Sequence, residues 1–205
     1  LHRVDRRQRQ MCIRDRIYPI RIISKLIVIA LVIFAFETAY SSHVFAQTSK
    51  LDGLFLELQN EQTKKYKKVE EEIWTEWRKS GSSDVDFLLE RGMDAMSNGN
   101  FIESVQYFTA AIKDAPDFSE AWNMRATVFF LMEKYSSSVA DIQQTLRLNP
   151  RHFGALGGLG MILERTERPK QALEVYKKLL GVHPHSKNAQ DAIMRLTQQL
   201  KGTSL

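Results

Sequence analysis

The stretch TLRLNP at residues 145–150 has two counterparts in the chain, AAIKDAP at 110–116 and LLGVHP at 179–184. Each stretch carries apolar residues and ends in a proline, and the three prolines stand 34 residues apart. A constant period of 34 residues is typical of a helix–turn–helix unit that repeats along a solenoid. The spacing therefore predicts helical units stacked side by side.

Alignment on the prolines brings small residues into register. The first half of each unit has one at the same place, at Gly92, Ala126 and Gly160. The second half has another, at Ser104, Ser138 and Ala172. Small residues at facing positions allow two paired helices to approach closely, so each unit is expected to be a tight helical hairpin. A single unit buries too little apolar surface alone, and three are about the minimum for a stable stack.

The middle unit resembles the tetratricopeptide repeat, whose pattern is W-x2-L-G-x2-Y, then A-x3-F, then a proline that ends the second helix. Trp122, Ala126 and Phe129 match the first helix, and Pro150 matches the end. Pro169 suits the first turn of a second helix. The resemblance implies an all-α fold, an α-solenoid of three tetratricopeptide helix–turn–helix units with N-terminal helices and a C-terminal capping helix. The expected units are residues 85–118, 119–152 and 153–186 within a repeat domain at 84–186.

Residues 187–205 form the expected C-terminal capping helix and tail. Ser186 is placed to cap this helix, whose apolar stripe includes Ala189, Ala192 and Leu196. The opposite side of the helix is polar. Such a helix suits the end of a solenoid, where one face is buried and the other meets water.

Residues 47–83 are predicted to form an N-terminal helical cap. Leu51, Leu54 and Leu58 follow helical spacing, and a second stripe contains Trp74 and Trp77. Lysines precede glutamates in this second helix, which is the reverse of the preference of the helix dipole, so tertiary contacts are expected to hold it. We interpret the tryptophans as the apolar face that covers the first repeat, with Ser83 or Asp84 capping the helix that follows. The alternatives for this segment are a binding site and a dimer surface.

The amino terminus accounts for the positive charge of the chain. Residues 1–46 hold 8 Lys and Arg against 3 Asp and Glu, whereas residues 47–205 hold 21 of each. A neutral body argues against nucleic-acid binding, which requires a clustered basic face. Residues 1–16 include RQMCIRDR, which resembles translated adapter sequence, so we interpret them as an artefact, the alternative being a basic extension. Cys12, the single cysteine, lies there.

Residues 17–46 have the order of a signal peptide. Arg21 and Lys25 precede an apolar run of 11 residues at 26–36, and VFA at 44–46 offers a small-residue cleavage site. The run is short for a membrane span, which needs about 20 apolar residues. We therefore expect export and a periplasmic location. The alternative is an uncleaved anchor in the inner membrane, the only case in which a membrane contact is expected.

Tetratricopeptide arrays bind partner segments on a concave face lined by the first helix of each unit, and the resemblance carries this role to specific positions. The residues expected to line this face are Asp86, Leu89, Met93, Met96, Glu120, Asn123, Thr127, Phe130, Leu131, Gly154, Gly157, Met161, Glu164 and Arg165. Met and Phe in a groove suit an adaptable apolar contact with a helix or an extended peptide. Some members of the family hold a partner's terminal carboxylate with cations on this face. Leu89, Met93, Gly154 and Gly158 supply none here, so we do not expect that mode.

Glycines crowd the start of the third unit, where residues 154–160 read GALGGLG. Neither a preceding strand nor a following Lys-Ser/Thr supports a phosphate-binding loop. Because glycine in a helix costs about 0.8–1 kcal/mol relative to alanine, these residues need a reason. Gly160 has one in helix packing. For Gly154 and Gly157 the hypothesis is a bare helix surface that a partner approaches, against tight packing within the chain.

The remaining polar residues indicate structural roles. Arg91 and Arg125 occupy equivalent places and are expected to extend between helices and pair with a carboxylate, Asp141 in the case of Arg125. His152, His183 and His185 fall in predicted turns and are interpreted as solvated. No ligand set for a metal, cofactor motif or catalytic triad is apparent.

Together these features predict a non-enzymatic protein-interaction module that needs no cofactor. We expect an exported scaffold or adaptor that binds a peptide or helix of an envelope protein. The alternative is a membrane-anchored accessory subunit of an envelope assembly complex. Self-association is a further possible outcome for the N-terminal helices.

Overall fold

The structure, a computed structural model, describes residues 50–60 and 62–202. The chain divides into two compact units, Leu1–Lys50 and Leu51–Leu205. The predicted basic extension or artefact at 1–16 and the predicted signal segment at 17–46 lie outside the described residues. Within the described ranges, no helix has the length and apolar character that crossing a membrane requires.

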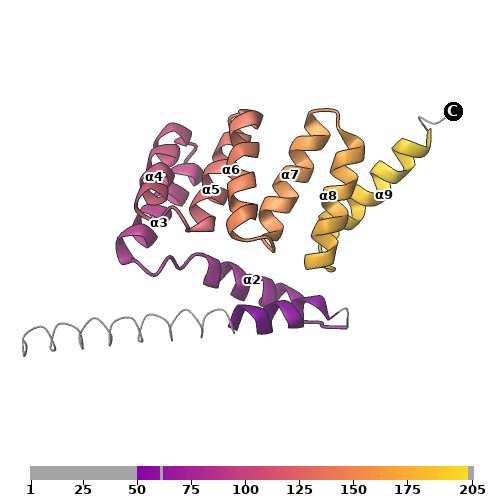
Figure 1. The fold of residues 1–205 in the computed structure, drawn as a ribbon, viewed down its shortest axis with the longest axis horizontal. Helices are drawn as coiled ribbons and strands as arrows, with labels where there is room; N and C mark the ends of the chain where they lie inside the picture. The colour runs from indigo at the N-terminus through magenta and orange to yellow at the C-terminus, as the bar shows by residue number, and fades with distance from the viewer. Residues whose placement is uncertain (1–49, 61, 203–205) are drawn as a thin grey trace, which may run out of the picture. The chain divides into compact units, whose positions relative to one another are not determined.

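The second unit is all helical over its described residues, which confirms the predicted fold class. Residues 50–59 are the described part of the first helix. The helices that follow are α2 (Tyr66–Trp77), α3 (Ser83–Ser97), α4 (Phe101–Asp114), α5 (Ser119–Leu131), α6 (Tyr135–Leu148), α7 (Phe153–Arg165), α8 (Pro169–Val182) and α9 (Lys187–Gly202). Figure 1 shows the pairs α3–α4, α5–α6 and α7–α8 in a row, with α9 beside α8. The three pairs are the three predicted units, and α9 is the predicted terminal helix.

The small residues in register lie where the two helices of each unit approach closely, as predicted. The Phe108 ring lies so close to Gly92 that a Cβ there would overlap it, and a Cβ at Gly160 would lie 2.6 Å from Tyr176 Cε1. Hydroxyl groups add a second contact in the first two units. The Ser104 Oγ donates to the Gly92 carbonyl and the Ser138 Oγ to the Ala126 carbonyl, each at 2.7 Å. Each bond ties the second helix of a pair to the buried middle of the first.

The turn inside each unit contains one residue with a left-handed backbone. Gly99 has φ +76°, and its equivalents Glu133 and Glu167 have φ +59° and +56°. Glycine adopts this region without steric cost, whereas a residue with a Cβ is strained there. All three turns have the left-handed conformation, but only the first has glycine, the residue that adopts it without strain.

We expect Glu133→Gly and Glu167→Gly each to raise the free energy of unfolding by about 0.5–1 kcal/mol, since relief of strain exceeds the added entropy of the unfolded chain. Urea denaturation followed by circular dichroism measures the change. Gly99→Ala is the matched control and should destabilise the protein. A loss of stability in both glutamate variants would contradict this reading of the turns.

The N-terminal segment does not cap the first repeat, contrary to prediction. Its buried side chains, Leu54, Phe55, Leu58, Val69, Ile73 and Trp77, join one core with residues of α7, α8 and α9. We call residues 51–79 the strap. Its packing on the third unit and α9 leaves the outer face of α3 uncovered, with Phe87 58% exposed.

The outer face of α3 carries a polar residue at a place where the later units have an apolar one. Val128 and Ile162 occupy equivalent places in the second and third units, and each is buried against the unit before it. The first unit has the exposed Asp94 at that place. A polar residue at this place suits a helix face that meets water at the end of the repeat array. A further correction concerns the start of α3, whose N-cap is Ser82 rather than Ser83 or Asp84.

Candidate functional site

The expected binding face is formed by the first helices of the units, α3, α5 and α7. On α3, Met93 and Met96 are partly exposed, whereas Leu89 is buried. Asp86 accepts hydrogen bonds from the backbone N–H and the hydroxyl of Ser80, at 2.7 and 2.6 Å. The Asp86 carboxylate therefore fixes the connection between the strap and α3.

A small pocket of about 90 Å³ lies between α5 and α7. Five of the predicted residues line it, namely Asn123, Thr127, Phe130, Gly154 and Met161. The wall and floor are completed by Ala126, Ser138, Ile142, Ala155 and Gly158. Met161 is 47% exposed at the pocket and Leu131 is 48% exposed nearby on α5. The structure thus brings the middle of the predicted set together around one mainly apolar hollow with an amide and two hydroxyls.

The charged side chains at the end of α7 contact other side chains of the protein. The Arg165 guanidinium lies 5.8 Å from the centre of the Phe130 ring. Glu164 accepts a hydrogen bond from the Tyr176 hydroxyl at 2.8 Å and one from Arg195 at 2.6 Å. Burial, helped by the bond to Glu164, raises the pKa of Tyr176. Glu164 is therefore a link from α7 to α8 and α9.

Glu120 of the predicted set is fully buried, together with His152, which was expected to be solvated. The backbone N–H of Ala155 donates to His152 Nδ1 at 3.1 Å, and His152 Nε2 lies 2.8 Å from Glu120 Oε2. Since Nδ1 accepts a bond, Nε2 carries the proton and donates it to the carboxylate. His152 is thus the N-cap of α7 and the partner of Glu120. Asn123, also buried, donates to the same Glu120 oxygen at 3.4 Å.

The strap explains why the histidines are not solvated. The Trp77 ring stacks on His152 with 4.3 Å between ring centres, and Trp74 meets the same imidazole edge-on at 5.5 Å. His183, 3% exposed, lies 3.3 Å through Nε2 from Glu70 Oε2, and this hydrogen bond lowers the pKa of Glu70. His185 stacks on Tyr66. The prediction of solvated histidines was therefore wrong, because these turns are the surface on which the strap docks.

Gly154 is not a bare surface left for a partner. A Cβ at this position would lie 2.5 Å from Trp74 Cη2, so the ring of Trp74 already occupies the space. At Gly157 a Cβ would meet Leu179 Cδ1 at 3.5 Å, which is an ordinary contact. The hypothesis is corrected for Gly154 and untested for Gly157.

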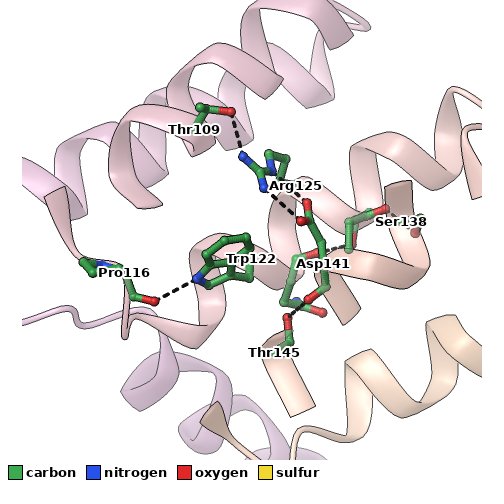
Figure 2. A network of polar contacts seen from close by, with 10 residues as sticks. Thr109, Pro116, Trp122, Arg125, Ser138, Asp141 and Thr145 are labelled. Atoms are coloured by element: carbon green, nitrogen blue, oxygen red, sulfur yellow. Dashed lines mark hydrogen bonds and ion pairs between the residues drawn. The ribbon is translucent and has the colours of Figure 1, made fainter. Parts of the chain in front are cut away.

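The predicted pair of Arg125 and Asp141 is present within the second unit, and Arg125 also reaches Thr109 of the first unit, as Figure 2 shows. Arg125 Nε and Nη2 donate to the two Asp141 oxygens at 2.7 and 2.8 Å, and Nη1 donates to Thr109 of the first unit at 3.0 Å. Arg91 differs from its prediction. It is exposed and lies over the Tyr107 ring, because Tyr107 stands at the place that Asp141 occupies in the next unit.

Stacked helix pairs with an inner face of exposed apolar side chains define the class of helical-repeat solenoids. A family model described as tetratricopeptide repeat matches residues 89–131 and 123–191. The chain belongs to the tetratricopeptide repeat family, which confirms the resemblance noted in the sequence. Repeats of this family are typically non-catalytic scaffolds for protein interaction. Among the described residues, no three His, Cys, Asp or Glu side chains converge as a metal site.

Relatives extend the match beyond the repeats. A TPR repeat-containing protein of Rhizobium etli is 33% identical over 154 residues, which are 75% of this chain and 76% of that protein. Small glutamine-rich tetratricopeptide repeat-containing protein 2 of Saccharomyces cerevisiae is 29% identical over 108 residues, covering 53% of this chain and 31% of that protein. The Rhizobium match is longer than the repeat region of this chain.

Solved structures show the same fold. The first TPR of Spaghetti (RPAP3), bound to the HSP90 peptide SRMEEVD, superposes with a TM-score of 0.56 at 20% identity, over 58% of this chain and 95% of that one. The TPR2B domain of yeast Sti1, in a complex with pHsp70, gives a TM-score of 0.54 at 17% identity, over 58% and 99% of the two chains.

Proposed function

We propose that this protein is an exported tetratricopeptide adaptor that binds an apolar segment of an envelope protein in the pocket between α5 and α7. The observation that carries the proposal is the pocket itself, in which the partly exposed Phe130 and Met161 flank a floor of small residues. Its volume of about 90 Å³ suits one apolar side chain of a partner helix or peptide. The similar tetratricopeptide domains bound to an HSP90 peptide and in a complex with pHsp70 support a protein segment as the partner.

The proposed partner segment is not the acidic carboxyl terminus of another protein. Leu89, Met93, Gly154 and Gly158 carry no charge, and the exposed Arg165 at the end of α7 lies over the Phe130 ring. Methionine side chains adapt to different apolar shapes. We therefore assign the pocket to an internal apolar segment of a partner, and no enzyme activity or cofactor enters the proposal.

The test is crosslinking capture from an envelope extract with the full chain, followed by affinity measurement with the purified captured protein. Phe130→Ala/Met161→Ala should weaken binding at least tenfold, since each truncation removes about 1–2 kcal/mol of apolar contact. Phe87→Ala/Met194→Ala is the matched control, because both side chains are exposed and lie outside the pocket. Equal binding by both double variants would place the contact elsewhere, and capture of the chain alone would reduce the function to self-association.

The export part of the proposal rests on the sequence of residues 17–46. The alternative, a membrane-anchored accessory subunit, keeps that segment attached. Amino-terminal sequencing of the exported protein separates the two, since a start at Gln47 requires cleavage and removes the anchored form.

A further inference from the structure

We infer that the surface at the junction of the second and third units, formed by His152, Phe153 and Gly154, is an exchangeable recognition site for an amphipathic helix with two aromatic side chains one turn apart. In this structure the strap of the same chain occupies the site. A partner helix of that chemistry would displace the strap. This inference stands on the contacts of the strap, so it can fail while the α5–α7 pocket still binds a partner.

The site is shaped for aromatic rings. Trp74 enters a notch above Gly154, where the absence of a side chain leaves room for Cη2. Trp77 stacks on His152 and lies 4.8 Å, between ring centres, from Phe153. Tryptophans at i and i+3 project from the same face of a helix. The notch and the flat imidazole therefore favour a helix with two aromatic residues at this spacing over a helix with only one.

The closed state leaves two buried polar atoms without partners. Among the described residues, Glu120 Oε1 and His183 Nδ1 are buried without a hydrogen bond. His183 contacts Glu70 of the strap directly, and Glu120 is connected to Trp77 of the strap through His152. An unsatisfied buried atom is costly, and the cost disappears when water or a new donor reaches it. Closure of the strap is thus opposed by a penalty that release removes.

The strap helix α2 has little stability of its own. It has 12 residues and no side-chain cap at its N-terminus. Its first turn lacks an acidic residue and its last turn lacks a basic one, so it gains nothing from the helix dipole. Short helices of this kind form mainly through tertiary contact. For α2 these contacts are made by Trp74 and Trp77 together with the buried Val69 and Ile73.

The pocket and the aromatic site are neighbours on one face. Gly154 lines the α5–α7 pocket and also meets Trp74. Glu120, expected from the sequence to line the concave face, is buried beside His152, on which the strap tryptophans pack. A partner that replaces the strap would uncover this carboxylate and could bring a donor to Oε1.

The experiment uses a fluorescein-labelled peptide of residues 64–79 and the full chain as receptor, with anisotropy as the readout. The Trp74→Ala/Trp77→Ala receptor should bind the peptide at least tenfold more tightly than the wild-type receptor, whose own strap competes at high effective concentration. The same peptide with both tryptophans replaced by alanine should bind at least tenfold more weakly. Adding Gly154→Leu to the receptor should remove binding by filling the notch.

Two results would overturn the inference. One is equal binding of the parent and tryptophan-free peptides to a folded receptor. The other is loss of the repeat helices in the double variant, which would make the strap part of the folding core. Gly154→Ala provides a second measurement by hydrogen exchange, and should lower the protection of residues 66–77 about tenfold while sparing α5 and α6. Gly157→Ala is the matched control, and unchanged protection in Gly154→Ala would also reject the exchangeable site.

Discussion

Replacing His152 with alanine is expected to lower the free energy of unfolding by about 3–5 kcal/mol, because it removes the shorter of the two hydrogen bonds to a buried carboxylate and leaves only the longer one from Asn123. Glu120 is fully buried, and its Oε2 accepts a hydrogen bond from His152 Nε2 at 2.8 Å. The variant also loses the cap on Ala155, which costs about 1 kcal/mol within that total. Urea denaturation followed by circular dichroism measures the effect.

A second substitution separates the hydrogen bond between His152 and Glu120 from the packing of the His152 ring. Glu120→Gln removes the charge and keeps an oxygen acceptor, so it should lie within about 1 kcal/mol of wild type. His152→Ala should then cost about 2 kcal/mol less in the Glu120→Gln background than in the wild type, because no buried carboxylate is left with only the long hydrogen bond from Asn123. An equal cost in both backgrounds would show that packing against Trp77, rather than the carboxylate, makes His152 important.

The repeat architecture could be predicted because its determinants are local and recur. The 34-residue spacing of the prolines defined the units, and Gly92 and Gly160 marked the helix contacts that the rings of Phe108 and Tyr176 fill. The pair of Arg125 and Asp141 followed from register between the helices of one unit. Such contacts connect residues whose separation is fixed by the repeat itself.

The place of the strap could not be predicted, because its contacts follow no repeat. Trp77 and His152 are 75 positions apart, and nothing in their spacing says that they stack. The amphipathic stripe predicted that the strap buries one face, and Leu58 and Ile73 are fully buried. It did not specify which unit supplies the surface. One signal was available, since Asp94 interrupts the apolar position shared by Val128 and Ile162 and so argued against a cap on the first unit.

The binding face was predicted in outline and altered by the strap. Thr127, Phe130 and Met161 meet at the α5–α7 pocket because register placed them on the first helices of adjacent units. Glu120 shares that register but is buried together with His152, and Gly154 is filled by Trp74. A sequence pattern gives the side of a helix that faces inward. It does not show whether another segment of the chain already lies there.

The close contact of Gly92 and Phe108 leads to a prediction in which one substitution changes sign with its background. Phe108 is fully buried in the first unit, so Phe108→Ala should cost about 3–5 kcal/mol through lost contacts and a cavity. A Cβ at Gly92 would overlap the Phe108 ring, so Gly92→Ala alone should cost about 1–3 kcal/mol through overpacking. Gly157→Ala, where a Cβ has room beside Leu179, is the control and should gain about 0.5–1 kcal/mol from helix propensity.

In the Phe108→Ala background the ring is gone, so Gly92→Ala should no longer overpack the interface. The same methyl then fills part of the cavity and gains helix propensity, which should raise the free energy of unfolding by about 1 kcal/mol relative to Phe108→Ala. Urea denaturation of the four proteins closes the cycle, with an expected coupling of about 2–4 kcal/mol. Additive effects would mean that the first unit adjusts its helix spacing freely. Strong coupling would mean that the closest contact in each hairpin sets that spacing, which is why glycine or alanine recurs there in every unit.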